Sequence, residues 1–233
     1  MYGVAQEIFD EITARRGKLH CIDRIDPARS ALVVIDMQNY FMKPGFQVEI
    51  PAARQIVPAI NRAARAVRSK GGMVAWIQTA SDGADRDWSF LHQQLLGPER
   101  SLRRLTELAE GSEGFALWPD LELHPADLSV TKRRYSAFIQ GSSGLEGELR
   151  GRGIDTVLIA GTATNVCCES TARDAMMLNF KTVMLADALA ASTTAAHVGA
   201  LTNCMQYFGD VMNVDELIAC ITPRAAAALS IAT

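Results

Sequence analysis

A carboxylate, an ammonium and a thiol each stand at the end of a predicted strand, far apart in the sequence. Asp36 ends the apolar run 31–36, Lys132 ends a strand predicted over 127–132, and Cys167 follows one predicted over 156–161. A cysteine at the start of a helix and beside a lysine is expected to have a stabilised thiolate. A carboxylate can accept the thiol proton and later pass it to a leaving amine. Together these residue types predict acyl transfer to water, with backbone amides of the strand–helix turn as donors to an oxyanion.

Each of the three residues also has a simpler explanation when it is taken alone. Asp36 is of a type that favours turns, and Lys132 is of a type that usually lies in solvent. Cys167 is of a type that usually behaves as a small buried apolar residue. One shared site explains three such residues at three strand ends better than three coincidences do.

Strands and helices alternate along the chain, and this alternation must position the three residues. Apolar runs predict strands at 31–36, 73–78, 127–132, 156–161, 181–187 and 210–213. Helical spacing predicts helices at 4–16, 53–70, 143–151, 166–178, 193–207 and 214–221. Residues 79–126 are irregular, with a helical piece around 89–109. The alternation predicts an α/β fold with an open parallel sheet covered on both faces. Ligands of such folds bind at the carboxyl ends of the strands.

Charge, apolar stretches and cysteine content indicate which classes of protein this chain does not resemble. The chain has 233 residues and a formal net charge of -3, which gives no reason to expect nucleic acid or a membrane surface as a partner. No stretch approaches the roughly 20 apolar residues that cross a bilayer, and the N-terminus lacks a secretory pattern. The five cysteines are scattered, so we expect free thiols in a reducing cytoplasm. We expect one domain over 1–233, with residues 1–29 as an N-terminal helical arm that packs on the domain or on a partner subunit.

Three segments resemble the signature regions of the isochorismatase-like cysteine hydrolases. They read "ALVVIDMQNYFMKPG", "TKRRYSAF" and "LIAGTATNVCCESTARDAMMLNFKTVMLADA", and the likeness covers residues 30–215. The resemblance implies a Rossmann-like three-layer αβα fold around a six-stranded parallel sheet. It implies Asp36 as general acid and base, Lys132 as its electrostatic partner and Cys167 as nucleophile. It further implies a cis peptide between Thr162 and Ala163 and an oxyanion hole formed by the amides of Ala163 and Cys167.

Comparison within this family favours C–N bond hydrolysis. True isochorismatases, which cleave a vinyl ether, lack a cysteine at the position that corresponds to Cys167. The segment "WIQTASDGADRDWSF" has no histidine where nicotinamidases carry metal ligands, and the four histidines of the chain show no ligand spacing. We therefore expect no metal and no cofactor. The stretches "KRRYSAF" and "GTATNVCCESTARDA" are similar to those of ureidoacrylate amidohydrolases, and biuret and N-carbamoylsarcosine hydrolases share the framework.

Candidate substrate-binding residues follow the strands. Gln78, Trp88 and Tyr135 combine an amide with aromatic rings, which suits a flat ureido group, although Trp88 could equally be a packing residue of its loop. Arg133 and Arg134 could hold a substrate carboxylate or lie solvated. The resemblance implies a small ureido or amide compound as the partner molecule and a homo-oligomer, either a dimer or a tetramer.

The sequence thus predicts a cofactor-independent cysteine amidohydrolase that acts through a thioester on a ureidoacrylate-like or biuret-like substrate. Cys168 should face about 100° away from Cys167 on a helix and be unrelated in role. Two alternatives remain open: a vinyl-ether hydrolase of the isochorismatase type, and a non-catalytic binding or assembly protein of the same fold.

Overall fold

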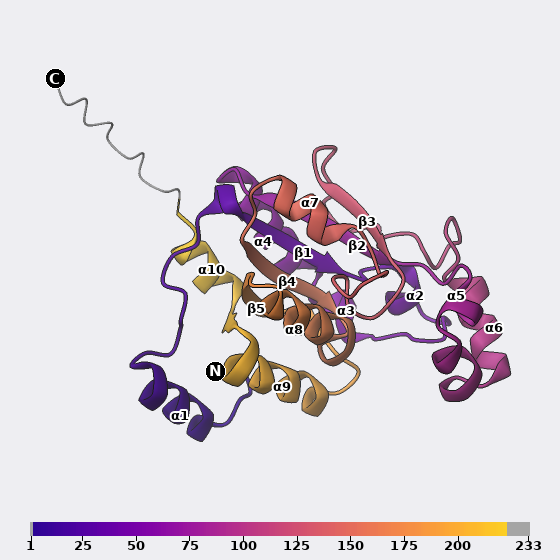
Figure 1. Ribbon diagram of the computed structural model, residues 1–233, viewed down its shortest axis with the longest axis horizontal. Helices are drawn as coiled ribbons and strands as arrows, with labels where there is room; N and C mark the ends of the chain where they lie inside the picture. The colour runs from indigo at the N-terminus through magenta and orange to yellow at the C-terminus, as the bar shows by residue number, and fades with distance from the viewer. Residues whose placement is uncertain (1, 223–233) are drawn as a thin grey trace.

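The computed structural model describes residues 2–222, and these fold around a six-stranded parallel sheet (Figure 1). The strands are β1 (Ser30–Ile35), β2 (Met73–Thr79), β3 (Leu128–Lys132), β4 (Thr156–Thr162), β5 (Lys181–Ala190) and β6 (Asp210–Met212). Their order is β3-β2-β1-β4-β5-β6, and every neighbouring pair is parallel. This confirms the predicted α/β fold. The chain reverses direction across the sheet between β1 and β4, which is where open α/β sheets bind ligands.

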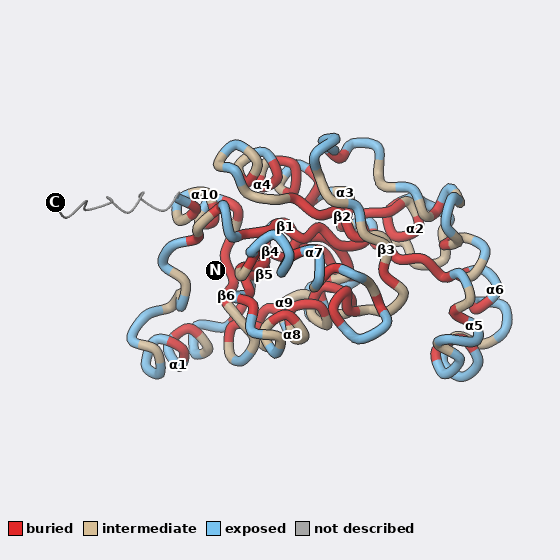
Figure 2. The backbone as a smooth tube through the Cα atoms, turned by 45° about the horizontal axis from the view of Figure 1, so that its top comes forward, coloured by how far each residue is buried: buried red, intermediate tan, exposed pale blue. Residues whose placement is uncertain are grey.

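Helices cover both faces of the sheet because side chains alternate along each strand. In β1, Leu32 and Val34 point to one face, while Ala31, Val33 and Ile35 point to the other. The first face packs against α3 (Ala52–Gln55), α4 (Val57–Ser69) and α10 (Val214–Cys220). The second face packs against α1 (Gln6–Arg16), α7 (Leu145–Gly151), α8 (Glu169–Met177) and α9 (Thr194–Asn203). Figure 2 shows the buried strands between helices whose outer sides are exposed.

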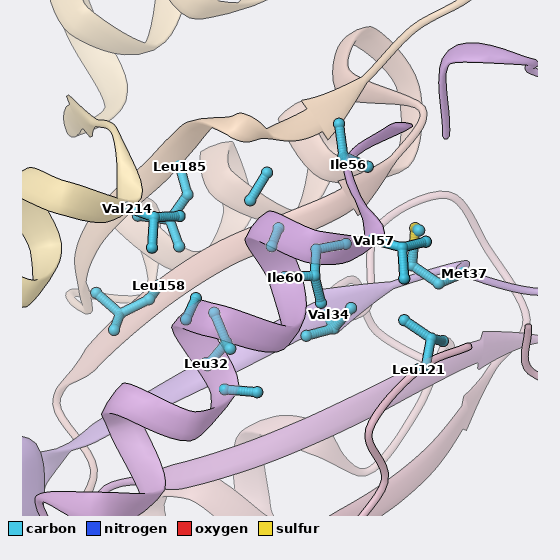
Figure 3. Close-up of a cluster of buried hydrophobic side chains, with 14 of the residues drawn as sticks. Leu32, Val34, Met37, Ile56, Val57, Ile60, Leu121, Leu158, Leu185 and Val214 are labelled. Carbon is cyan, nitrogen blue, oxygen red and sulfur yellow. The ribbon is translucent and has the colours of Figure 1, made fainter. Parts of the chain in front are cut away.

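The core on the first face consists mainly of branched aliphatic side chains, as Figure 3 shows. Leu32, Ile60 and Leu158 are each 0% exposed. Burial of one such side chain contributes roughly 1.5–3 kcal/mol relative to leaving it in water. This packing gives the sheet the rigidity that a site at its edge requires.

The N-terminal arm lies on its own domain. Phe9 and Ile12 of α1 are buried against the second face of the sheet. The guanidinium groups of Arg15 and Arg16 donate to the carbonyl oxygens of Gln206 and Met205, both at 2.7 Å. Of the two alternatives for the arm, the structure shows packing on the domain. The residues 223–233 that the predicted domain includes lie outside the described part of the chain.

A long connection between β2 and β3, residues 80–127, first extends beyond the carboxyl ends of the strands (Figure 1). It then returns past α4, where Asp120 and Asp127 bond to Asn61 and Arg68, to the start of β3. It contains α5 (Ala84–Asp87), a π turn (Phe90–Leu95) and α6 (Pro98–Glu107). The Ser81 amide donates to the Leu108 carbonyl oxygen at 3.0 Å, which ties the end of α6 to the end of β2. The short α2 (Asn39–Met42) follows β1 at the same edge of the sheet.

Several predicted boundaries differ from the structure; the strand predicted over 181–187, for example, continues to Ala190. The helix predicted over 53–70 is divided at Ile56 into α3 and α4, because Pro58 has no backbone N–H with which to continue a helix from the preceding turn. The strand predicted over 73–78 continues to Thr79. Within residues 2–222, no helix has the length and apolar content needed to cross a membrane.

Candidate active site

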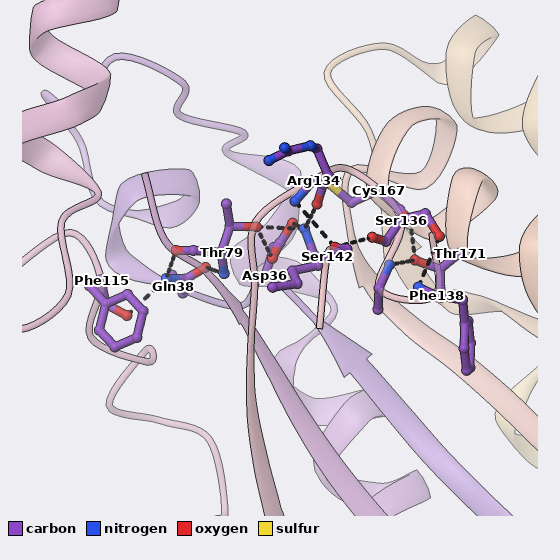
Figure 4. Close-up of polar contacts among 12 residues, drawn as sticks. Asp36, Gln38, Thr79, Phe115, Arg134, Ser136, Phe138, Ser142, Cys167 and Thr171 are labelled. Carbon is purple, nitrogen blue, oxygen red and sulfur yellow. Dashed lines mark hydrogen bonds and ion pairs between the residues drawn. The ribbon is translucent and has the colours of Figure 1, made fainter. Parts of the chain in front are cut away.

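Asp36 and Lys132, both predicted as site residues, form a buried ion pair at the carboxyl edge of the sheet. Figure 4 shows Asp36 there, near Thr79 and Cys167. Lys132 Nζ lies 2.9 Å from Asp36 Oδ2, and both side chains are 0% exposed. Asp36 follows β1 directly and has a φ of 55°, in the left-handed region that Asp tolerates better than most residues. This conformation ends the strand at Asp36.

Thr79, at the end of β2, bridges Asp36 and Lys132. Its hydroxyl donates to Asp36 Oδ1 at 2.8 Å and accepts from Lys132 Nζ at 2.5 Å. The third donor position of the ammonium is taken by the Arg134 carbonyl oxygen at 3.1 Å. Three strand ends are thereby joined through a fully bonded ammonium group.

The environment of Lys132 keeps it charged. Burial alone would lower the pKa of Lys132, but Asp36 and Cys167 more than offset burial and raise the pKa above its ordinary value. The site therefore holds a positive charge beside Asp36 across the physiological pH range.

Cys167 lies in a π turn (Thr164–Cys168) that leads from β4 into α8, and it is 5% exposed. Burial, followed by the negative charge of Asp36, raises the pKa of the Cys167 thiol to about 12, and Lys132 only partly opposes this. The sequence-based expectation of a stabilised thiolate is therefore wrong for the free protein. A thiol next to a carboxylate that can receive its proton is the arrangement present.

Close approach of two strands places this turn beside Asp36. Gly161 pairs with Ile35, and a Cβ added at Gly161 would lie 2.1 Å from the Ile35 carbonyl oxygen. Glycine is therefore required for β4 to lie this close to β1 just before the site. The peptide bond between Thr162 and Ala163 is cis, as the family resemblance implied.

The turn arranges its backbone amides around the Ala163 carbonyl. The amides of Val166 and Cys168 donate to that oxygen at 3.1 and 3.2 Å. The Cys168 side chain is 0% exposed and belongs to the core of the second face. Cys168 is thus a packing residue next to Cys167.

Two residues of the site, Gln38 and Thr79, were missed in the sequence. The Gln38 carboxamide accepts from the Thr79 amide at 2.8 Å and donates to the Thr79 carbonyl at 3.0 Å. It also donates to the Phe115 carbonyl at 2.9 Å, so it joins the end of β2 to the long connection. The sequence signal that could have identified Thr79 is its position at the end of a strand, which it shares with Asp36 and Lys132.

The predicted substrate-binding residues divide into two groups. The rings of Trp88 and Tyr135 meet edge to face, with centroids 4.7 Å apart, and both line a cavity of about 430 Å³ beside α8. Gln78 lies apart from them, because alternation along β2 puts it on the face of Trp76, opposite to that of Thr79. Its amide donates to the Phe115 carbonyl at 2.9 Å. The structure brings Trp88 and Tyr135 together but does not bring Gln78 to them.

The two arginines after Lys132 are committed to protein groups. Arg133 pairs with Glu110 at 2.9 Å. Arg134 donates to the Asp87 carbonyl at 2.7 Å, and its guanidinium carbon lies 5.4 Å from the centroid of the Trp88 ring. Among residues 2–222, no group of three or more His, Cys, Asp and Glu side chains is placed to hold a metal ion.

Lys132→Met is expected to lower the free energy of unfolding by about 3–5 kcal/mol, because it leaves Asp36 as a buried charge without a partner. Urea denaturation measures this loss. Since the folded-state pKa of Lys132 is raised, the pair's contribution is fully present below the ordinary value of 10.5 and is lost as pH rises through the higher folded value. The double variant Asp36→Asn/Lys132→Met is the control and should recover part of the loss. A loss below about 1 kcal/mol in the single variant would show that the pair contributes no more than an exposed one.

Comparison with known proteins agrees with this geometry. Residues 30–216 match the family model described as Isochorismatase domain. A cysteine hydrolase from Pseudomonas syringae pv. phaseolicola 1448A is 29% identical over 84% of this chain and 93% of its own, with a TM-score of 0.76. An isochorismatase-like hydrolase from Alkaliphilus metalliredigens is 30% identical over 82% and 98%, with a TM-score of 0.66. N-carbamoylsarcosine amidase from Thermoplasma acidophilum shares the fold, at 24% identity over 80% and 97% and a TM-score of 0.62. Since the family match covers most of the chain, this protein belongs to the isochorismatase-like family of hydrolases.

Proposed function

We propose that this protein is a cysteine amidohydrolase that cleaves a C–N bond of a small ureido, carbamoyl or amide compound through a thioester. The observation that carries the proposal is the buried Asp36–Lys132 pair beside the buried Cys167 thiol, whose pKa is raised. An Asp36–Lys132 pair that served only to stabilise the fold would not require a cysteine thiol beside it. A nucleophile with a thiol pKa of about 12 needs a base beside it.

In the first half of the reaction, Asp36 accepts the Cys167 proton as sulfur attacks the substrate carbonyl. Lys132 pairs with Asp36 and moderates the charge that develops on sulfur. The raised thiol pKa means that the thiolate forms only as it attacks. The oxyanion is received by the amides of Ala163 and Cys167, and Asp36 returns its proton to the leaving nitrogen as the C–N bond breaks.

In the second half, water hydrolyses the thioester. Asp36, ionised again after the amine has left, removes a proton from the water, and the tetrahedral intermediate collapses with sulfur as the leaving group. Cys167 regains its proton, and the Asp36–Lys132 pair is restored. No cofactor enters this cycle.

Trp88 and Tyr135 are the side chains that we propose to contact the flat part of the substrate, since their rings share one cavity. The amide chemistry is supported by the fold shared with an N-carbamoylsarcosine amidase and by the likeness to a cysteine hydrolase. The likeness of "KRRYSAF" to ureidoacrylate amidohydrolases makes ureidoacrylate the first compound to test.

The experiment combines ammonia release with mass spectrometry of the protein. Ureidoacrylate, biuret, N-carbamoylsarcosine and nicotinamide are offered as substrates, and samples quenched in acid are digested and searched for an acyl group on Cys167. We expect ammonia from at least one compound and an adduct on Cys167 alone. Cleavage of a vinyl ether such as isochorismate without ammonia would favour the isochorismatase-type reaction. No turnover and no adduct would favour a binding protein.

A further inference from the structure

A buried arginine of the long connection has no acidic partner. Arg104 on α6 is 7% exposed, and no carboxylate of residues 2–222 lies within ion-pair distance of it. Its Nε is buried without a hydrogen-bond partner, and its guanidinium carbon lies 5.8 Å from the centroid of the Tyr40 ring. The preceding residue, Arg103, shows the ordinary situation, since it is largely exposed and pairs with Glu107 at 2.6 Å. A buried cation without a counter-charge is costly and calls for an explanation.

Arg104 belongs to the same edge of the sheet as the catalytic residues. Tyr40, over which it lies, is in the short helix that follows β1 and Asp36. Leu108, at the end of α6, accepts a hydrogen bond from Ser81, which follows the end of β2. The positive charge of Arg104 also lowers the pKa of both Cys167 and Tyr135 against the larger effect of burial, so it is felt at the thiol and at the aromatic pocket.

Further buried polar atoms without partners occur on the same connection. His92 is 2% exposed, and its Nδ1 pairs with Ser101 Oγ at 2.8 Å, which leaves Nε2 without a partner. Ser81 is 1% exposed, and its hydroxyl has no partner among the described residues. Burial and then the charge of Arg104 lower the pKa of His92, while Asp85 opposes them, so the neutral ring is favoured. Buried polar atoms without partners, on the same connection as a buried cation, are suited to a polar, anionic ligand.

We infer that Arg104 binds a carboxylate of the substrate, and therefore that the substrate is a ureido or amide acid and not a neutral amide. This rests on the proposed amidohydrolase function. Among the described charges that act on the Cys167 thiol, Asp36 and Lys132 form an ion pair with each other, whereas the guanidinium of Arg104 is in no ion pair. A guanidinium binds a carboxylate through two parallel N–H···O bonds, which fixes orientation as well as charge. Arg133 and Arg134 are engaged with Glu110 and Asp87 and do not offer this fork.

A different role for Arg104 would be to act on the thiol through its charge alone. Alkylation of Cys167 separates the two roles, because iodoacetate and iodoacetamide transfer groups of nearly equal size that differ by one negative charge. In each case sulfur forms a C–S bond and iodide leaves. An effect on the thiol changes both rates by the same factor, whereas recognition of a carboxylate changes their ratio.

We expect Arg104→Gln to lower the ratio of the iodoacetate rate to the iodoacetamide rate at Cys167 by at least tenfold. Arg103→Gln is the matched control, one residue away and exposed, and should leave the ratio unchanged. Arg104→Lys should give an intermediate ratio, since it keeps the charge but lacks the fork. An unchanged ratio in Arg104→Gln would overturn the inference, and so would failure of iodoacetate to modify Cys167 in the unsubstituted protein. Urea unfolding of each variant checks that the fold is retained.

Turnover of two related substrates provides an independent test of the role of Arg104. An N-carbamoyl amino acid and its carboxamide are compared as substrates. We expect the acid to be preferred, with KM for the acid raised at least tenfold in Arg104→Gln and KM for the carboxamide unchanged. Equal use of both compounds would reject the Arg104 inference and leave the amidohydrolase proposal standing. An alkylation ratio that depends on Arg104 without any ammonia release would leave the anion site standing and reject the proposed function.

Discussion

Cys167→Ala is expected to reduce turnover by about 10⁴-fold or more, whereas Cys168→Ala should retain most of the activity. Loss of a nucleophile removes the covalent route, and the remaining groups of such sites give only residual catalysis. Cys168 is buried in the core of the second face, and its thiol has no role in the proposed cycle. Ammonia release under saturating substrate measures the difference.

The two variants form a matched pair, because both remove one sulfur atom from a buried position in consecutive residues. Any loss of packing is therefore shared, and urea unfolding will show whether it is equal. Similar losses of activity in both variants would show that packing of the turn, and not a nucleophile, supports the activity. Full activity of Cys167→Ala would exclude the thioester.

Asp36→Asn is expected to have opposite effects on turnover and on alkylation of Cys167. Turnover should fall by about 10³-fold or more, because the amide cannot accept the thiol proton or return it to the leaving nitrogen. Alkylation by iodoacetamide at pH 7 should become faster. The Asp36 charge raises the pKa of the thiol and Lys132 lowers it, so removal of Asp36 leaves only the lysine beside the sulfur.

The pH dependence of alkylation measures this change. In the unsubstituted protein the rate should keep rising above pH 9, since the pKa of the thiol is about 12. In Asp36→Asn the rise should occur at lower pH. Lys132→Met is the control with the opposite sign, because it removes the charge that lowers the thiol pKa. A slower reaction of Asp36→Asn at neutral pH would contradict the expected effect of the Asp36 charge on the thiol pKa.

Much of this fold could be predicted because its signals are local and repeated. Runs such as "ALVVID" and "TVLIAG" have the continuous apolar character of strands that are buried on both faces, and β1 and β4 are such strands. Parallel pairing then brings the carboxyl ends together without any knowledge of strand order. That rule was sufficient to place Asp36 and Lys132 in one site, and the structure joins them directly.

A single-residue error explains why the end of β2 was read incorrectly. The strand was predicted to end at Gln78, whereas it ends at Thr79. Because side chains alternate, a shift of one residue moves the candidate to the opposite face of the sheet. The hydroxyl that bridges Asp36 and Lys132 was thus replaced in the prediction by an amide that bonds to Phe115.

The state of the thiol and the role of Arg104 could not be predicted for a different reason. A helix start and a nearby lysine are visible in the sequence and favour a thiolate, but the burial that outweighs them is a property of the whole fold. Arg104 looks like any arginine of an amphipathic helix, beside Arg103. Only the tertiary structure, in which Arg104 lies over Tyr40, shows that one of these neighbours is buried and the other is not.

The residues proposed for the reaction and most of those proposed for substrate binding lie on different segments of the chain. The groups that we propose to move protons and attack the carbonyl follow β1, β3 and β4, whereas Trp88 and Arg104 both lie on the connection 80–127. That connection begins after Thr79 of β2 and ends before β3, two strands that pair directly. Changes in its exposed parts can therefore alter the side chains proposed to contact the substrate, while its bond to Gln38 at Phe115 supports the reacting groups. In enzymes of this architecture, substitutions in one loop segment can change the substrate while the catalytic residues stay the same.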